Sequence, residues 1–305
     1  MIGRYQTARA FRVALEDRLQ QMALTRGVDL MRLRRQVAFD RILARLFAAP
    51  APQWLLKGGY TFELRLGSGA ARVTRDLDLS IPVLAPLVAS DAMPAALSTT
   101  IREALQDAAE LDLHDGFIFL IGEPMADLDA APDGGARYPV EARLDARTFT
   151  TFHLDVGVGD AIIAPPEWLT GQDMLDFAGI PPVRAAALSR EQQFAEKLHA
   201  YTLPRGERVN TRVKDLLDLM LLIDMGLPDR EQMRQALRAT FERRRTHALP
   251  ASLDAPPASW RIPYAALAAD CHLVLIDVDD AFTAVSTYYQ TIGMTRPAPD
   301  EREDG

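Results

Sequence analysis

The fold of this chain is decided by the stretch Leu55-Leu56-Lys57-Gly58-Gly59-Tyr60-Thr61-Phe62-Glu63-Leu64 and by the segment Arg72-Val73-Thr74-Arg75-Asp76-Leu77-Asp78-Leu79-Ser80 that follows it. The first stretch predicts a glycine pair that leads into a helix over 60–66. The second alternates apolar and polar residues, which predicts a β-strand over 72–81. A glycine turn, a helix and an acidic strand therefore follow one another within about thirty residues.

Two carboxylates leave one face of the predicted strand, because residues two apart in a strand point the same way. Asp76 and Asp78 would repel each other there unless a positive charge lies between them. A hard divalent cation such as Mg²⁺ suits this arrangement, since it takes one or two carboxylates together with phosphate oxygens. Asp155 lies in a later predicted strand and would add a third carboxylate if the two strands pair side by side.

The glycine pair points to phosphate. Gly58 and Gly59 precede a predicted helix, so their backbone N–H groups can approach a phosphate closely and the helix N-terminus adds positive potential. Each signal has an ordinary structural explanation by itself: an exposed alternating strand, a turn, a surface carboxylate. Their joint occurrence in this order and spacing favours a nucleotide-binding and metal-binding site.

Composition limits the class of protein. The chain has 305 residues, 48% hydrophobic and 25% charged, which is typical of one large or two modest globular domains. Its single cysteine, Cys271, excludes an internal disulfide and a cysteine-based zinc site. No apolar run reaches the roughly 20 residues of a membrane span, and the N-terminal segment lacks the apolar core of a signal peptide. We therefore expect a cytoplasmic protein without a membrane partner.

Charge is unevenly distributed along the chain, although the net charge is −8. Residues 1–75 carry a net charge of +9, residues 76–183 of −15, residues 184–245 of +4 and residues 246–305 of −6. The two basic segments would attract a polyanion if the fold brought them together. The alternative is that the arginines of residues 32–45 only solvate a helix. Only three basic residues are lysine, namely Lys57, Lys197 and Lys214.

Hydrophobic periodicity predicts helices, then a mixed sheet, then a helical half. Gly27 is expected to end the first helix and Asp29 to cap the second. Helices are expected over 6–25, 29–48, 60–66, 91–112, 189–201, 213–225, 228–245 and 264–292, and strands over 72–81, 117–121, 138–144 and 150–158. Within the last helix, residues 273–278 could instead be extended. The expected domains are a core over 1–184, a helical domain over 185–294 and a disordered acidic tail over 295–305.

The quoted motifs resemble the AbiEii family of nucleotidyltransferase toxins, the toxin halves of AbiE-type and MenAT-type toxin–antitoxin systems. The resemblance extends to Ala195-Glu196-Lys197-Leu198-His199-Ala200 and to Asn210-Thr211-Arg212-Val213-Lys214-Asp215-Leu216-Leu217-Asp218-Leu219. It covers most of residues 10–225, and all three lysines fall inside these motifs. It implies an α+β fold with a polymerase-β-like nucleotidyltransferase core, a small mixed sheet and a C-terminal helical domain.

The resemblance also implies roles for particular residues. Lys57, Gly58 and Gly59 would hold the triphosphate of a nucleoside triphosphate, while Asp76 and Asp78 would be catalytic and bind Mg²⁺ or Mn²⁺. Asp155 would be a third metal ligand.

Two further catalytic positions and one regulatory position follow from the same family. Lys197 would contact the nucleotide phosphates, and Asp215 would orient it or act near the acceptor. Thr74 matches a position where some relatives carry a hydroxyl that is phosphorylated. Tyr60 departs from the serine that many members of the superfamily carry after the glycines.

Three functions remain to be distinguished. The first is a metal-dependent toxin that transfers a nucleoside monophosphate to RNA, with tRNA as the expected acceptor, and is neutralised by a cognate antitoxin. The second is a small-molecule nucleotidyltransferase of the antibiotic-modifying type, which would need no basic surface and would tolerate salt. The third is a non-catalytic nucleotide-binding module. The nucleotide, the acceptor and the oligomeric state are left open by the sequence.

Overall fold

The computed structural model describes residues 3–67, 69–82, 94–128, 131–206, 209–226 and 229–293. The chain divides into two compact units, which are described separately below. The first contains Met1–Asp160 and Ala164–Ser189, and the second contains Ala161–Ile163 and Arg190–Gly305. The expected acidic tail over 295–305 lies outside the described residues. Every helix in the described part of the chain is too short or too polar to cross a bilayer.

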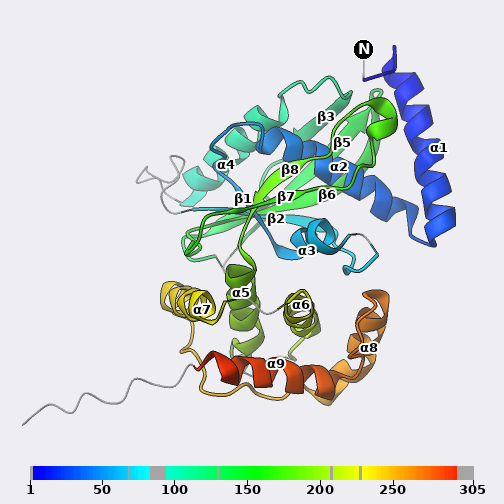
Figure 1. The fold of residues 1–305 in the computed structure, drawn as a ribbon. Coiled ribbons are helices and arrows are strands. Elements are labelled where there is room, and N and C mark those ends of the chain that lie inside the picture. The colour runs from blue at the N-terminus through cyan, green and yellow to red at the C-terminus, as the bar shows by residue number, and fades with distance from the viewer. Residues whose placement is uncertain are drawn as a thin grey trace, which may run out of the picture. The chain divides into compact units, whose positions relative to one another are not determined.

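The first unit is built on a mixed sheet with the strand order β3-β5-β6-β2-β1-β8-β7, and β4 pairs with β5 at the side (Figure 1). Its strands are β1 Leu55–Lys57, β2 Asp76–Ile81, β3 Phe117–Ile121, β4 Ala126–Asp127, β5 Gly135–Leu144, β6 Arg147–Val158, β7 Glu167–Thr170 and β8 Arg184–Ala187. The four predicted strands are present. The four strands that sequence patterns missed have two to four residues each, too few to show a period of two.

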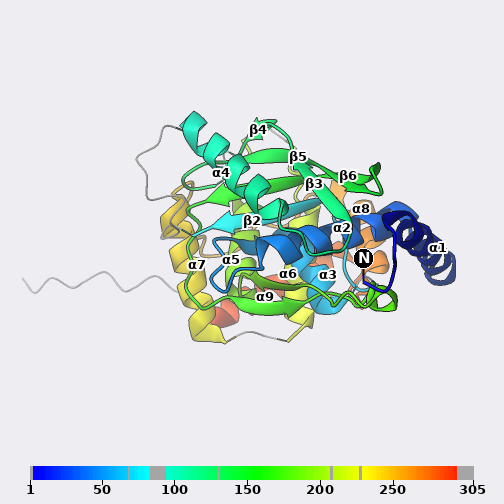
Figure 2. The same ribbon diagram turned by 90° about the horizontal axis from the view of Figure 1, so that it is seen from above.

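Helices cover the two faces of this sheet unequally. They are α1 Ala8–Arg26, α2 Leu30–Leu46, α3 Gly58–Leu66 and α4 Pro94–Ala109. Helices α2 and α4 lie over one face, as the view from above shows (Figure 2), and contact β6, β3 and β5. Helix α3 contacts β2, β1 and β7. Among the described residues, the helices of this unit with extensive contacts to β6, β5 and β3 are α2 and α4, on that one face (Figure 1).

The caps predicted for the first two helices are confirmed. Gly27 ends α1 with a left-handed φ of 65°, a conformation that suits glycine. Asp29 caps α2, and its side chain accepts a hydrogen bond from the Arg32 amide. Local side-chain chemistry thus sets the turn between these helices.

Two arginines of α2 are buried, whereas both interpretations of the arginines of residues 32–45 placed them at the surface. Arg41 and Arg45 are buried and converge on the fully buried Asp115 at 2.7 Å each. Arg45 also donates to the Phe117 carbonyl, so the pair anchors α2 to the start of β3. These two side chains therefore neither solvate the helix nor form part of a surface for a polyanion.

Strand β2 begins at Asp76, four residues later than predicted. The reason is a side chain: Glu63 of α3 accepts a hydrogen bond from the Thr74 amide at 3.2 Å, so that amide is not available to a strand ladder. Burial raises the pKa of Glu63 above its ordinary value, partly offset by Arg32 and Gln36. The segment before β2 is thus tied to α3 instead of to the sheet.

The second unit is helical. It contains α5 Arg190–Thr202, α6 Val213–Asp224, α7 Arg230–Arg244, α8 Arg261–Asp270 and α9 Val278–Ile292. Helix α5 packs on α6 and α7, while α6 also packs on α8 and α9. The single helix predicted over 264–292 is divided, because Asp277 caps α9 by accepting hydrogen bonds from the amides of Asp279 and Asp280. No strand is present in the described segment 273–278.

Candidate active site

Three acidic residues share one face of the sheet in the first unit. Strand β2 pairs with β6 in parallel, with Asp78 opposite Asp155 and Asp76 opposite His153. Residues paired in this way point to the same side, so Asp76, Asp78 and Asp155 lie on the same face. We call this surface the carboxylate face. In the part of the chain that the structure describes, it is the face of β6 and β5 opposite to α2 and α4.

A row of charged residues crosses four strands at the centre of this face. Arg137 of β5 is paired with Asp155, Asp155 with Asp78, and Asp78 with Lys57 of β1. The charges along the row are positive, negative, negative and positive. Each carboxylate therefore has a cation on one side, which offsets the repulsion between the two acids.

Arg137 holds Asp155 through two parallel hydrogen bonds of 2.7 Å, from Nε to Oδ1 and from Nη2 to Oδ2. The same Nη2 lies 3.6 Å from Asp76 Oδ2. These hydrogen bonds, together with the charges of Asp155, Asp76 and Asp78, raise the pKa of Arg137 above its ordinary value. On the other side of Asp76, His153 Nδ1 lies 3.1 Å from Oδ1. The guanidinium thus stands where two of the acids would otherwise face each other.

The carboxylate face suits a divalent cation in its donor chemistry. Among the described residues, however, no three Asp, Glu, His or Cys side chains are already grouped around a common point for a metal ion. The position of Arg137 explains this, because its guanidinium draws Asp155 to β5 and supplies the positive charge itself. Asp76 and Asp78, as hard oxygen donors beside a stand-in cation, fit Mg²⁺ or Mn²⁺. Asp155 would first have to leave Arg137.

The glycine pair lies directly against this face. Gly58 adopts a φ of +68°, and a Cβ built on it would lie 1.9 Å from Asp78 Oδ2. A Cβ on Gly59 would lie 2.8 Å from the Thr74 hydroxyl. Both positions therefore require glycine for steric reasons. Because α3 begins at Gly58, its N-terminal amides lie beside Asp78, and a helix N-terminus favours an anion such as phosphate.

Lys57 occupies the end of the charged row. Its ammonium forms an ion pair with the buried Asp160, which also accepts a hydrogen bond from Ser80 at 2.9 Å. A Cβ on Gly157 of β6 would lie 3.4 Å from Lys57 Nζ, which is van der Waals contact, so the ammonium lies directly over this glycine. Lys57 is thus held in place next to Gly58 by a fixed counter-charge.

Thr74 lies between the glycine pair and the acids. Its hydroxyl donates to the Asp76 carbonyl at 3.1 Å, and the residue is 8% exposed. Its amide is bound by Glu63. Glu63 in turn accepts a hydrogen bond from Gln36 and lies 3.5 Å from Arg32 Nη2. This buried network links α2 and α3 to the segment that carries the acids.

The remaining predicted residues form a cluster within the second unit. Lys197 of α5 lies 2.7 Å from Asp218 and 3.3 Å from Asp215, both on α6. Arg212 lies 3.6 Å from Asp215. Asp218 is fully buried, so the Lys197 ammonium compensates a charge that has no contact with solvent. These ion pairs thereby join α5 and α6 at residues that lie in the two family motifs of the helical half.

Arg137, His153, Ser80 and Asp160 were not predicted as site residues. Arg137 was missed because the strand was expected to begin at Tyr138, whereas β5 begins at Gly135. His153 and Ser80 carry a recognisable signal in retrospect. They lie two residues from Asp155 and Asp78, so they share the carboxylate face.

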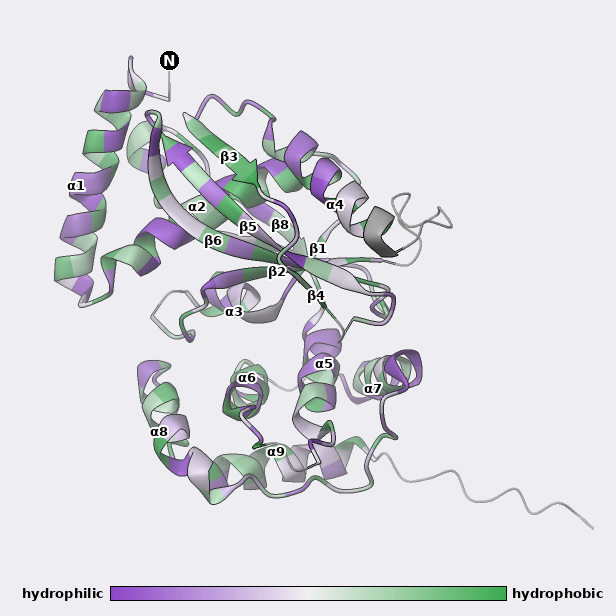
Figure 3. Ribbon diagram, turned by 180° about the vertical axis from the view of Figure 1, so that it is seen from behind, coloured by the Kyte–Doolittle hydropathy of each residue, from purple (hydrophilic) through white to green (hydrophobic). Residues whose placement is uncertain are grey.

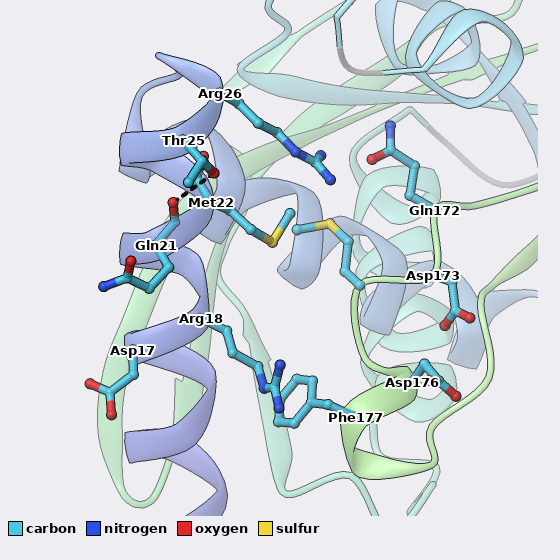
Figure 4. Close-up of a pocket in the computed structure, with 11 residues that line it drawn as sticks. Asp17, Arg18, Gln21, Met22, Thr25, Arg26, Gln172, Asp173, Asp176 and Phe177 are labelled. Atoms are coloured by element: carbon cyan, nitrogen blue, oxygen red, sulfur yellow. Dashed lines mark hydrogen bonds between the residues drawn. The ribbon is translucent and has the colours of Figure 1, made fainter.

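A separate cavity of about 590 Å³ lies between α1 and the segment 172–177 (Figure 4). Arg18 from α1 covers the ring of Phe177 at 4.3 Å, and Met22 points between the two segments. Acidic residues, including Asp17 and Asp173, also border it. None of the predicted site residues lines this cavity, so it does not belong to the carboxylate face.

Comparison with known proteins shows which family this chain resembles. The family model described as nucleotidyl transferase AbiEii toxin, type IV toxin–antitoxin system, matches residues 41–285. The solved structure of MenT4, a nucleotidyltransferase toxin from Mycobacterium tuberculosis H37Rv, is similar with a TM-score of 0.56 and 16% identity. The similarity covers 92% of this chain and 99% of that chain. No curated protein sequence matches the chain. The expected α+β fold with a mixed sheet is confirmed.

Proposed function

Because the chain belongs to the AbiEii family of nucleotidyltransferase toxins, we propose that it transfers a nucleoside monophosphate from a nucleoside triphosphate to RNA, at the acceptor end of a tRNA. Membership of a toxin–antitoxin family implies a cognate antitoxin. We place the reaction in the cytoplasm, where both nucleoside triphosphates and tRNA are present. The observation that carries the proposal is the close approach of Gly58 to Asp78, which would set a phosphate bound at the glycine pair beside the acids.

Asp76 and Asp78 are the proposed metal ligands, with Asp155 as a third once it is released from Arg137. When bound, a divalent cation such as Mg²⁺ or Mn²⁺ offsets charge on the phosphoryl oxygens and lowers the proton affinity of the acceptor hydroxyl. Without a divalent cation, the Arg137 guanidinium offsets the negative charges of Asp155 and Asp76. Three carboxylates on this face then stand against the charges of Arg137 and Lys57, and Lys57 is also paired with Asp160.

The glycine pair and its neighbours have the task of positioning the triphosphate. The amides of Gly58 and Gly59 and the N-terminus of α3 would bind the β- and γ-phosphates, and Lys57 adds a fixed positive charge next to them. In the reaction the acceptor oxygen forms a bond to the α-phosphorus. The bond from that phosphorus to the bridging oxygen breaks, pyrophosphate leaves with the electron pair, and the hydroxyl proton passes to water.

Lys197 and Asp215 keep the roles that the family resemblance implies for them. Lys197 is the proposed contact for nucleotide phosphates, and Asp215 is the acid that orients it. Their ion pair within the second unit supports this division of roles, since a lysine held by two acids from one helix has a restricted position.

Phosphorylation of Thr74 is the proposed means of regulation. A phosphate on this hydroxyl would press against Gly59, where the nucleotide phosphates are proposed to bind. It would also add negative charge beside Asp76. Both effects would oppose binding of a nucleoside triphosphate. Because Thr74 is nearly buried, a kinase would need the segment before β2 to open.

The test is a transfer assay with each of the four labelled nucleoside triphosphates, Mg²⁺ and total RNA. We expect label on tRNA from the wild-type chain. Asp78→Asn and Gly58→Ala should each lower transfer about a hundredfold or more, the scale on which removal of one group that acts on the transition state reduces kcat. Gly69→Ala is the matched control, because a Cβ on Gly69 would meet nothing within 4 Å.

Three outcomes would contradict the proposal. Label on no RNA with any nucleotide would argue against transfer to RNA. Transfer to an antibiotic-type small molecule instead would indicate the antibiotic-modifying alternative. Growth inhibition that survives both Asp76→Asn and Asp78→Asn would indicate a toxic activity that does not depend on these acids.

A further inference from the structure

The edge strand β3 has a hydrophobic side that points away from the core. All five residues of Phe117–Ile121 are hydrophobic, as the green arrow in Figure 3 shows. Phe117, Phe119 and Ile121 are buried, whereas Ile118 is 58% exposed and Leu120 is 38% exposed. The exposed pair faces the same side as the carboxylate face, because Leu120 is paired through Glu141 with Thr151 of β6. Exposed apolar side chains in this position need an explanation.

Leu120 lines a cavity of about 490 Å³ that reaches the carboxylate face. Met125, Pro139, Thr151 and His153 are among its other lining residues. Pro139, His153 and Asp76 stand in one cross-strand register over β5, β6 and β2. His153 therefore borders the cavity, and its Nδ1 contacts the Asp76 carboxylate at 3.1 Å. The cavity begins one strand spacing, about 4.8 Å, from the acidic strand.

The cavity lies where the acceptor would have to approach a nucleotide whose phosphates are bound at the glycine pair. In phosphoryl transfer the attacking oxygen and the leaving oxygen lie roughly in line on opposite sides of the phosphorus. The glycine pair lies on the β1 side of β2, and the cavity lies on its β6 and β5 side. With pyrophosphate leaving toward the glycines, the acceptor hydroxyl has to approach from the side of His153.

The lining favours a nucleobase over a phosphate or a polycation. Leu120, Met125 and Pro139 provide apolar contact, and the described residues that line the cavity include neither lysine nor arginine to bind a phosphate. The one carboxylate in the lining, Glu141, is already bound by Arg143 at 2.8 Å and by Thr148. An antibiotic-type polycation would therefore find no unengaged acid among these residues. A flat ring with a polar edge fits such a cavity.

We propose that the cavity formed by Leu120, Met125, Pro139 and His153 binds the terminal nucleoside of the RNA acceptor and presents its ribose hydroxyl to the carboxylate face. The inference rests on the proposed transfer to RNA and adds to it the place where the acceptor binds. Apolar contact with the base supplies the binding. His153, which contacts both the cavity and Asp76, marks the point at which the ribose meets the acids.

The test compares two tryptophan substitutions in β3. Leu120→Trp fills the cavity, whereas Ile118→Trp changes an exposed residue on the same strand and face that does not line the cavity. With total tRNA as acceptor, Leu120→Trp should raise KM for tRNA about tenfold or more, the size of a lost base contact, with Ile118→Trp close to wild type. The Kd of each variant for the Mg²⁺–nucleoside triphosphate should equal that of the wild type.

A cross-link locates the nucleoside directly. A tRNA with a 3′-terminal 8-azidoadenosine should label the peptide that contains residues 118–125 in the wild type, and Leu120→Trp should reduce this labelling while Ile118→Trp should not. Equal KM values for the two variants, or a cross-link confined to other peptides, would overturn the proposal. A raised Kd for the nucleoside triphosphate in Leu120→Trp would also overturn it, since the cavity would then hold the donor base. Failure of the wild type to label tRNA would instead contradict the proposed function.

Discussion

At the scale of single residues, Arg137 affects what the carboxylate face can bind. Its guanidinium makes two hydrogen bonds to Asp155 and lies 3.6 Å from Asp76. Like charges held together raise the free energy of a site, and a cation between them lowers it. A divalent metal that uses these acids therefore has to compete with a cation that the protein already supplies.

Replacing Arg137 should make metal binding tighter and the metal-free protein less stable. For Arg137→Gln we expect the affinity for Mn²⁺ to rise about twofold to fivefold, the size of a partly exposed ion pair. In EDTA the melting temperature should fall, because the acids lose their counter-charge. Calorimetric titration with Mn²⁺ and thermal unfolding with and without metal measure the two effects.

The control for this substitution is Arg143→Gln, which removes an arginine from the same strand and face, paired with Glu141 instead of with the acids. It should leave Mn²⁺ affinity unchanged. If Arg137→Gln weakened Mn²⁺ binding, Arg137 would be supporting the metal site by orienting Asp155, and the competition described above would be wrong.

At the scale of elements, α5 and α6 are joined by a lysine between two acids. Asp218 has no exposed surface, and the Lys197 ammonium lies 2.7 Å from its carboxylate. The same lysine is the proposed phosphate contact. A loss of activity in a Lys197 variant therefore has two explanations, a lost contact or a disturbed helix pair, and a double-mutant design separates them.

Lys197→Ala should destabilise the second unit by about 3–5 kcal/mol, since it removes the ammonium that lies 2.7 Å from a buried carboxylate. Lys197→Ala combined with Asp218→Asn should recover much of that stability, because the uncompensated charge is gone. Transfer activity should stay low in both. Urea unfolding and the labelling assay give the two readouts, and recovery of activity in the double variant would show that Lys197 has a structural role alone.

The contact of α5 with α7 includes a buried histidine that should make stability depend on pH. His199 lies against Phe241 and His247, and its Nε2 is 2.7 Å from the Thr246 hydroxyl. Burial, with added repulsion from Arg244 and His247, lowers the pKa of His199 to about 3. In the unfolded chain a histidine has a pKa of about 6.5.

The sign of the pH effect follows from these two values. Below about pH 6.5 His199 binds a proton in the unfolded chain but not in the folded chain. The free energy of unfolding therefore falls as the pH drops toward 3, by up to about 1.4 kcal/mol per pH unit for one histidine. His199→Gln should reduce this slope, measured as urea midpoints between about pH 4.5 and 7. His114→Gln, which changes an exposed histidine, should leave the slope as in the wild type. An equal slope in all three proteins would show that His199 is protonated in the folded chain.

At the scale of the whole molecule, positive and negative charges are concentrated in different segments of the chain, which the net charge of −8 does not show. Several arginines of the basic N-terminal segment are engaged with acids inside the first unit. Arg34 forms an ion pair with Glu16 at 2.6 Å, and Arg41 and Arg45 form ion pairs with the buried Asp115. The basic charge that can meet RNA is thus smaller than the count for residues 1–75.

A moderate salt dependence should follow for an RNA acceptor. At saturating nucleoside triphosphate, KM for tRNA should rise about tenfold to twentyfold between about 50 and 200 mM salt, the slope for about three phosphate contacts with a flexible strand. Initial rates over a tRNA series at each salt concentration measure this slope. A KM that stays constant over this range would indicate an acceptor that is not a polyanion.

Local patterns determined the elements and the chemistry that they carry. Alternation placed Asp76 and Asp78 on one face, the glycine pair preceded a helix start, and Gly27 and Asp29 ended and capped neighbouring helices. These features depend on a period of two or on the φ and hydrogen bonds of a single residue, so they are readable over a few positions. The family motifs rest on the same local signals.

The tertiary structure decided which strands became neighbours. That β6 lies parallel to β2 with Asp155 opposite Asp78, and that β5 then brings Arg137 against Asp155, depends on pairings between segments up to about eighty residues apart. A period of two shows which side a residue takes but not which strand lies beside it. Asp76 and Asp78 share a face by local rules, whereas Asp155 opposite them, the guanidinium among these acids and the hydrophobic cavity beside them depend on the assembly of the whole sheet.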